Sequence, residues 1–93
     1  MRSVGVPWYR REDYGKIRSV MEDADSLASS YDQWLMAAES SEAEARRVGI
    51  EVVRVTIEPE AFTQWCLERG AARTRAARVA FVEDAMRRRQ EGA

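Results

Sequence analysis

Hydrophobic and polar residues along this 93-residue chain follow two periods, one typical of helices and one typical of a strand. Only residues 51–57 alternate with a period of two, with valine and isoleucine on one face. Apolar residues elsewhere recur at helical spacing, over residues 11–23, 31–48, 59–69 and 74–89. The pattern predicts a helix-dominated α+β fold of about four helices and one short strand, in a single domain over residues 1–93.

Local signals mark where these helices begin and end. Ser29 or Ser30 can cap the second helix, and Gly49 followed by Ile50 predicts a left-handed stop of the Schellman type. Pro59 suits the first position of the third helix, and Gly70 ends it. The second helix is mostly polar over residues 39–44, so we expect its middle to touch little of the core.

The strand needs a partner, because its backbone donors and acceptors cannot be satisfied within one strand. The segment Ser3 to Trp8 can cover part of one edge, although Pro7 cannot donate to a ladder. Alternatively, a valine-rich edge can pair with a second copy of itself, antiparallel about a two-fold axis near Arg54. We expect this homodimer, and we expect Val55→Pro to dissociate or unfold it.

The core should form where the strand meets the third helix. We expect Phe62 and Trp65 to be core residues beneath the face of the strand that carries Val53, Val55 and Ile57. Cys66 is the only cysteine, so it can form no disulfide within the chain, and in mid-helix it is expected to be a buried core residue.

The residue types present argue against common catalytic chemistry. The chain has no histidine, which removes the commonest general base and metal ligand, and no glycine pattern that cradles phosphates. We therefore expect no enzymatic activity, no cofactor and no metal site. The opening residues lack the apolar run of a signal peptide, and no apolar run is long enough to span a membrane, which predicts a soluble cytoplasmic protein.

Charge is distributed unevenly although the net charge is only −1. Residues 22–60 carry ten acidic residues against three arginines, whereas residues 69–89 carry seven arginines against two acids. Such a basic helix can be simply solvated, or it can contact an anionic partner. Arg10 and Arg11 beside Trp8 and Tyr9 form a second candidate binding group, unless nearby acids neutralise the arginines.

Several aromatic residues recur near the predicted helix faces. Trp8, Tyr14, Tyr31 and Trp34 can line a ligand pocket, because such pockets are aromatic with a few polar groups. The same residues at helical spacing can instead form ordinary core.

Two resemblances bear on function. The run from Trp8 to Tyr14, the pair Tyr31 and Trp34, and the segment from Pro59 to Cys66 resemble a group of small bacterial proteins with no assigned activity. This resemblance implies no catalytic or binding residue.

Residues 52–89 are similar to ribbon-helix-helix DNA-binding proteins, in which two chains pair their strands and one strand face reads DNA bases. That resemblance implies Val52, Arg54 and Thr56 as the reading face. The third helix is about one turn shorter than the family's, only Arg54 on the strand is basic, and the preceding acidic region opposes phosphate binding.

Taken together, the sequence favours a non-enzymatic domain that acts as a dimer or as a protein-interaction module. A ribbon-type DNA-binding regulator is the first alternative, and a small-ligand binder that uses the aromatic cluster is the second.

Overall fold

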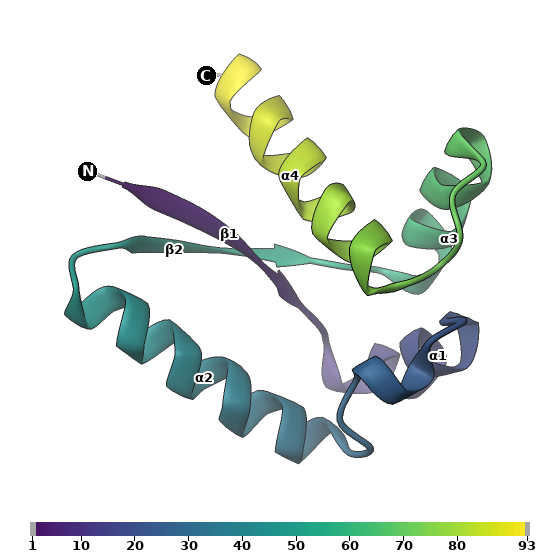
Figure 1. Ribbon diagram of the computed structural model, residues 1–93, viewed down its shortest axis with the longest axis horizontal. Helices are drawn as coiled ribbons and strands as arrows, with labels where there is room; N and C mark the ends of the chain where they lie inside the picture. Colours follow the sequence, from purple (N-terminus) through teal and green to yellow (C-terminus); the bar gives the residue numbers. More distant parts are fainter. Residues whose placement is uncertain (1, 93) are drawn as a thin grey trace.

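The computed structural model describes residues 2–92. It has two strands, four α-helices and one short 3-10 turn, which confirms the helix-dominated α+β fold (Figure 1). In chain order these are β1 (Ser3–Trp8), α1 (Arg11–Val20), η1 (Ala24–Ser26), α2 (Tyr31–Arg47), β2 (Glu51–Thr56), α3 (Pro59–Arg69) and α4 (Arg75–Glu91). The first helix ends at Val20, before the expected residue 23, and η1 follows it as a separate turn.

The two strands form one parallel sheet. Ser3 lies opposite Glu51 at one end, and Trp8 lies opposite Thr56 at the other. Of the two partners that the sequence left open for the strand, the N-terminal segment is therefore paired with it inside the chain.

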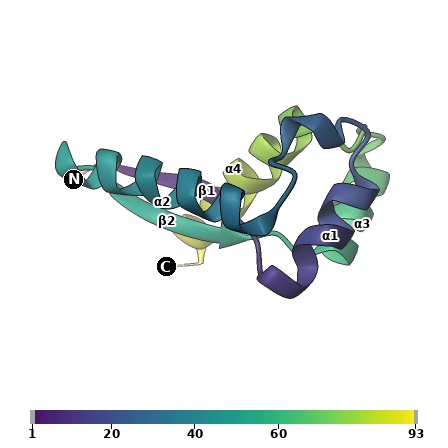
Figure 2. The same cartoon turned by 90° about the horizontal axis from the view of Figure 1, so that it is seen from below.

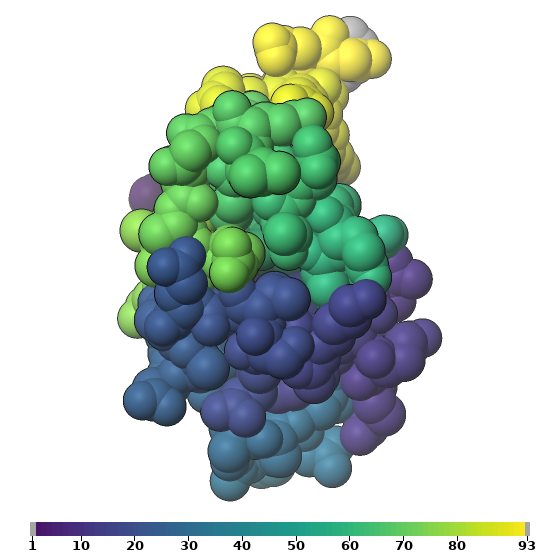
Figure 3. Space-filling view, turned by 90° about the vertical axis from the view of Figure 1, so that its right-hand side faces the viewer, coloured from purple at the N-terminus to yellow at the C-terminus, as the bar shows by residue number. Residues whose placement is uncertain are grey.

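Helices cover both faces of this sheet. Figure 1 shows α2 on one side of the strands and α4 on the other, and Figure 2 shows α2 running along the sheet. Beyond the ends of the strands at Trp8 and Thr56, α1 and α3 pack against each other. They lie side by side on the face seen in Figure 3.

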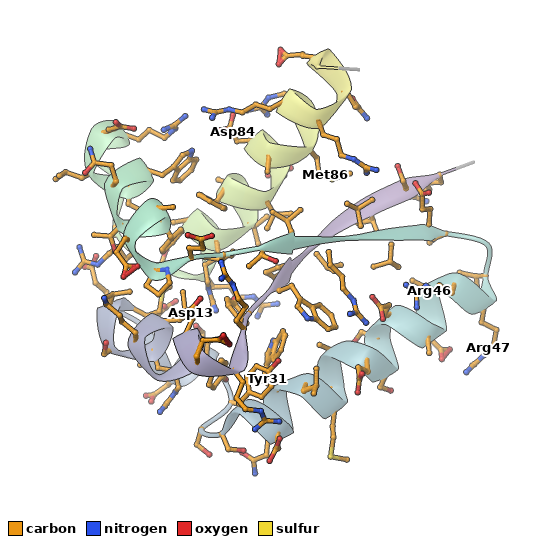
Figure 4. The ribbon with its side chains drawn as sticks, turned by 180° about the vertical axis from the view of Figure 1, so that it is seen from behind. Asp13, Tyr31, Arg46, Arg47, Asp84 and Met86 are labelled. Carbon is orange, nitrogen blue, oxygen red and sulfur yellow. The ribbon has the colours of Figure 1, made fainter. Side chains whose placement is uncertain are left out.

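The contact between α4 and β1 depends on a glycine. A Cβ atom at Gly5 would lie 2.5 Å from Cγ of Met86 and 2.9 Å from Cγ1 of Val82. Figure 4 shows Met86 on α4 near this strand. Because Gly5 has no side chain, α4 can approach the sheet closely.

The core lies where the sheet, α1, α3 and α4 meet. Phe62 is fully buried as expected, with its ring centroid 5.6 Å from that of Phe81. Trp65 is only half-buried, packs against Phe81, and donates its indole N–H to Asp84 at 3.2 Å. The buried apolar residues are Tyr9, Tyr14, Ile17, Met21, Leu27, Ile57, Phe62, Cys66, Ala77 and Val82.

The predicted helix stops are confirmed. Gly49 has a φ of 84°, and the N–H of Ile50 donates to the carbonyl of Ala45 at 3.0 Å, as in a Schellman motif. Gly70 has a φ of 62° and ends α3. The apolar pattern predicted for the second helix extended to Val48. This prediction is wrong at Val48, which lies just beyond the last turn of α2 and is 70% exposed.

Two glycines with opposite surroundings test this packing. A Cβ at Gly15, inside α1, meets nothing within 4 Å, so Gly15→Ala should raise the free energy of unfolding by about 0.5–1 kcal/mol. Gly5→Ala should lower it by about 1–3 kcal/mol, because Met86 and Val82 must move. Denaturant unfolding measures both effects.

The double variant Gly5→Ala, Met86→Ala is the control, since removing the Met86 side chain opens the space that the new methyl group needs. Compared with Met86→Ala alone, the double variant should lose less stability than Gly5→Ala loses relative to the parent. Equal stability of Gly5→Ala and the parent would contradict the close contact between β1 and α4.

Candidate interaction surface

The parallel ladder divides the backbone groups of β2 between two edges. The N–H of Glu51 donates to the carbonyl of Arg2 at 2.9 Å, and the N–H of Ile57 donates to the carbonyl of Trp8 at 2.8 Å. Because backbone direction alternates along a strand, the odd-numbered residues of β2 bond to β1. The even-numbered residues Val52, Arg54 and Thr56 then direct their N–H and C=O groups away from β1.

These outward groups form what we call the outer edge of β2, comprising the backbone of Val52, Arg54 and Thr56. Within residues 2–92, no hydrogen bond reaches the backbone N–H or C=O groups of these three residues. The outer edge of β1 is different, because Pro7 is one of its outward residues and has no N–H to donate. The outer edge of β2 is therefore the more complete template for another strand.

The side chain of Arg54 lies at the centre of this edge and is held by α2. Its Nε and Nη2 donate to the two carboxylate oxygens of Glu42 at 2.8 and 2.7 Å, which is a bidentate pair. Its guanidinium also lies 3.8 Å from the ring centroid of Trp8. Arg54 is therefore fixed on one side by a carboxylate and on the other by an indole.

Glu42 is the exception to the expectation that the middle of α2 touches little of the core, since the other residues of 39–44 are exposed. The residue is only 5% exposed, and Arg46 contributes a second cation at 3.2 Å. The hydrogen bond from Arg54, together with the positive charge of Arg46, lowers the pKa of Glu42 below its ordinary value. Glu42 therefore stays ionised at neutral pH and compensates the charge of Arg54.

The two arginines of the second candidate binding group, Arg10 and Arg11, form ion pairs within the chain. Arg10 pairs with Asp13 and Glu58, and Arg11 pairs with Asp32, so these arginines do not form one free basic group with Trp8 and Tyr9. The neutralising acids include residues far along the chain.

The pairing of β2 also bears on DNA reading by its side chains. In ribbon-helix-helix proteins, the strand face that corresponds to Val52, Arg54 and Thr56 of this chain reads DNA bases. Here Arg54 bonds to Glu42 of α2, and β2 pairs in parallel with β1 of the same chain. A ribbon-helix-helix protein instead pairs this strand antiparallel with a second chain and leaves its side chains open to DNA.

The aromatic residues that the sequence singled out form a cluster beside the Glu42–Arg54 pair. The centroids of Trp8 and Trp34 are 5.0 Å apart, and Tyr9 lies 4.9 Å from Trp34. Edge-to-face packing of this kind holds the N-terminal strand against α2. Tyr14 and Tyr31 complete the cluster, and Figure 4 places Tyr31 at the start of α2.

Tyr9 is the most deeply buried member of this cluster. Its exposed fraction is 1%, and Arg78, itself only 5% exposed, donates to its hydroxyl at 3.2 Å. Burial raises the pKa of Tyr9, with the Arg78 charge acting in the opposite direction. Tyr9 is therefore a neutral, structural residue at neutral pH and not part of an exposed binding group.

A groove runs between α2 and the sheet, beside Trp8 and Trp34. Its volume is about 370 Å³. The sequence pointed to the aromatic residues of this region but not to the groove itself, because the small residues of α2 that leave it open look like ordinary helix formers. The lining residues are Val6, Pro7, Trp8, Trp34, Ala37, Ala38, Ser41, Glu42, Ala45, Val52 and Arg75.

Cys66 offers no activated thiol. It is 1% exposed, and burial raises the pKa of its thiol. Across the described part of the chain, no three residues of histidine, cysteine, aspartate or glutamate gather in a way that could hold a metal ion. Nor does any described helix have the length and apolar character needed to cross a membrane.

No protein-family model, curated protein or solved structure matches this chain. Functional proposals therefore start from the geometry described above.

The Glu42–Arg54 pair makes a pH-dependent prediction. Glu42→Gln should lower the free energy of unfolding at pH 7, because Arg54 loses its ionised partner. The folded-state pKa of Glu42 lies below the unfolded value of about 4.3, so the pair's contribution is complete above that value. It is lost as the pH falls through the lowered folded pKa.

Denaturant unfolding of the parent and of Glu42→Gln between pH 7 and pH 3 measures this effect. The difference between the two proteins should be constant near neutrality and shrink in acid. Glu44→Gln is the control, since Glu44 is exposed and forms a surface ion pair with Arg47. A Glu42→Gln difference that does not change with pH would count against an ionised Glu42.

Proposed function

We propose that this chain acts as a non-enzymatic homodimeric interaction domain, in which the outer edges of β2 from two copies pair to form one continuous sheet. The observation that carries this proposal is the row of outward backbone groups on Val52, Arg54 and Thr56, which have no partner within residues 2–92. A strand edge of this kind is a template for another strand.

Symmetry selects the register of the pairing. A two-fold axis beside Arg54 would place this residue opposite its own copy, and Val52 of each chain opposite Thr56 of the other. Antiparallel strands exchange N–H and C=O bonds between such opposed residues. Every outward N–H and C=O group of the edge would then have a partner, which a register shifted by one residue does not achieve.

The electrostatic cost of this register is small. Two arginines directly opposite each other would normally repel across the strands. Here each Arg54 already bonds to Glu42 of its own chain through two hydrogen bonds, and Trp8 lies against its guanidinium. Each chain therefore brings a compensated pair to the axis.

The size of the sheet favours the same assembly. Two strands alone are marginal in water, and a 93-residue chain buries a limited core. Joining two copies would give a four-stranded sheet with a helix layer on each face. The chain's lack of histidine and its buried Cys66 support a role in binding rather than in catalysis.

Proline substitutions at neighbouring positions test the proposal. The N–H of Thr56 points outward, so Thr56→Pro should leave the fold intact and shift the protein from dimer to monomer. Light scattering over a concentration series should give twice 10.6 kDa for the parent and 10.6 kDa for Thr56→Pro. Thr56→Ala keeps the N–H and should remain dimeric.

Val55→Pro is the matched comparison. The N–H of Val55 faces β1, so this change should break the ladder within the chain and lower the melting temperature, rather than dissociate folded dimers. A parent protein that stays monomeric at the highest concentration, or a Thr56→Pro variant that stays dimeric, would refute pairing through this edge.

A further inference from the structure

We propose that the groove between α2 and the sheet binds a small organic carboxylate with a flat apolar body. The groove has a volume of about 370 Å³, which lies within the range of ligand pockets, roughly 300–1,000 Å³. This inference is independent of dimerisation.

Small side chains on α2 keep the groove open. Ala37, Ala38, Ser41 and Ala45 line it from the helix, at spacings that place them along one side of α2. Larger residues here would fill the space between helix and sheet, as protein interiors normally require. The opposite wall contains Val6 and Val52 from the two strands, so much of the lining is apolar.

The polar groups of the groove without a protein partner in residues 2–92 include two indole N–H donors and the Ser41 hydroxyl, which can donate or accept. Trp8 and Trp34 both line it, and within the described residues neither indole N–H donates to a protein acceptor, whereas the N–H of Trp65 bonds to Asp84. Trp8 and Trp34 are both half-buried, and neither indole nitrogen is among the buried atoms that lack a partner, so each N–H is open to solvent and available to a ligand. A ligand that supplies acceptor atoms can replace water at these N–H groups.

Charge at the groove favours an anion. Arg75 lines it from the first turn of α4, and no carboxylate of residues 2–92 lies within ion-pair distance of its guanidinium. Asp23 is nearby but accepts from the backbone N–H of Arg75, at 2.9 Å. Glu42, the acid in the lining, is already held by Arg54 and Arg46. A carboxylate can therefore pair with Arg75 while a flat apolar body lies against the indoles.

The groove and the proposed dimer edge use different groups of the sheet, since Val52 contributes its side chain to the groove and its backbone to the edge. Pro7, which lines the groove, directs its backbone to the outer edge of β1, and Arg75 comes from α4, which packs on β1. The dimer edge is the opposite one, on β2. Ligand binding and dimerisation can therefore succeed or fail separately.

The test uses 2-naphthoate as the probe and 2-naphthylmethanol as its neutral match. Titration calorimetry should show saturable binding of the acid and binding at least about tenfold weaker for the alcohol, since an ion pair is worth on the order of a tenfold change in affinity. In NMR spectra, the indole N–H signals of Trp8 and Trp34 should shift with the acid. The signal of Trp65 should not, because its N–H is bonded elsewhere.

Three variants assign the site. Ala38→Leu should fill the groove and abolish binding without lowering the melting temperature, because there is space for the added atoms. Arg75→Gln should remove the preference for the acid over the alcohol. Arg89→Gln, at an exposed arginine later on α4, should bind like the parent.

The proposal fails if the parent shows no saturable binding of 2-naphthoate at millimolar concentration. It also fails if Ala38→Leu, shown to be folded by its melting temperature, binds as tightly as the parent, or if the Trp65 signal shifts in place of those of Trp8 and Trp34.

Discussion

The parallel ladder between β1 and β2 is the constraint on which the rest of this structure depends. It satisfies one edge of β2 inside the chain and, by the alternation of backbone direction, leaves the groups of Val52, Arg54 and Thr56 on the other edge. The helices cover the two faces of the sheet, and no third strand forms within residues 2–92. A small domain built in this way retains one complete edge, and this is the edge at which we propose that a second copy pairs.

The Glu42–Arg54 pair joins α2 to the sheet beside that edge. Its bidentate geometry and the low exposure of Glu42 fix the position of Arg54, while Trp8 packs against the guanidinium. The same arrangement holds α2 beside the sheet, so that the small residues of α2 form one wall of the groove, with Trp34 beside Trp8. One ionic contact thus bears on both proposed binding surfaces, because it compensates a charge at the edge and forms part of the groove wall.

The sequence predicted what depends on neighbouring residues and left open what depends on distant ones. Gly49 and Gly70 end helices through local backbone geometry, so both stops were predictable. The partner of the strand was not, since Ser3 to Trp8 and a second chain offer similar backbone groups. The burial of Glu42 was also missed, because a glutamate in a polar run looks solvated until the fold places Arg54 beside it. The groove arises from spacing between elements, which periodicity does not report.

Amide hydrogen exchange at single residues of β2, followed by NMR over a range of protein concentrations, tests the role of the outer edge most directly. The account predicts that the N–H groups of Val53, Val55 and Ile57 are protected at every concentration, because they bond to β1. Those of Val52, Arg54 and Thr56 should exchange quickly in dilute protein and become protected as the concentration rises. Rapid exchange of these three amides at all concentrations would contradict a dimer paired through β2.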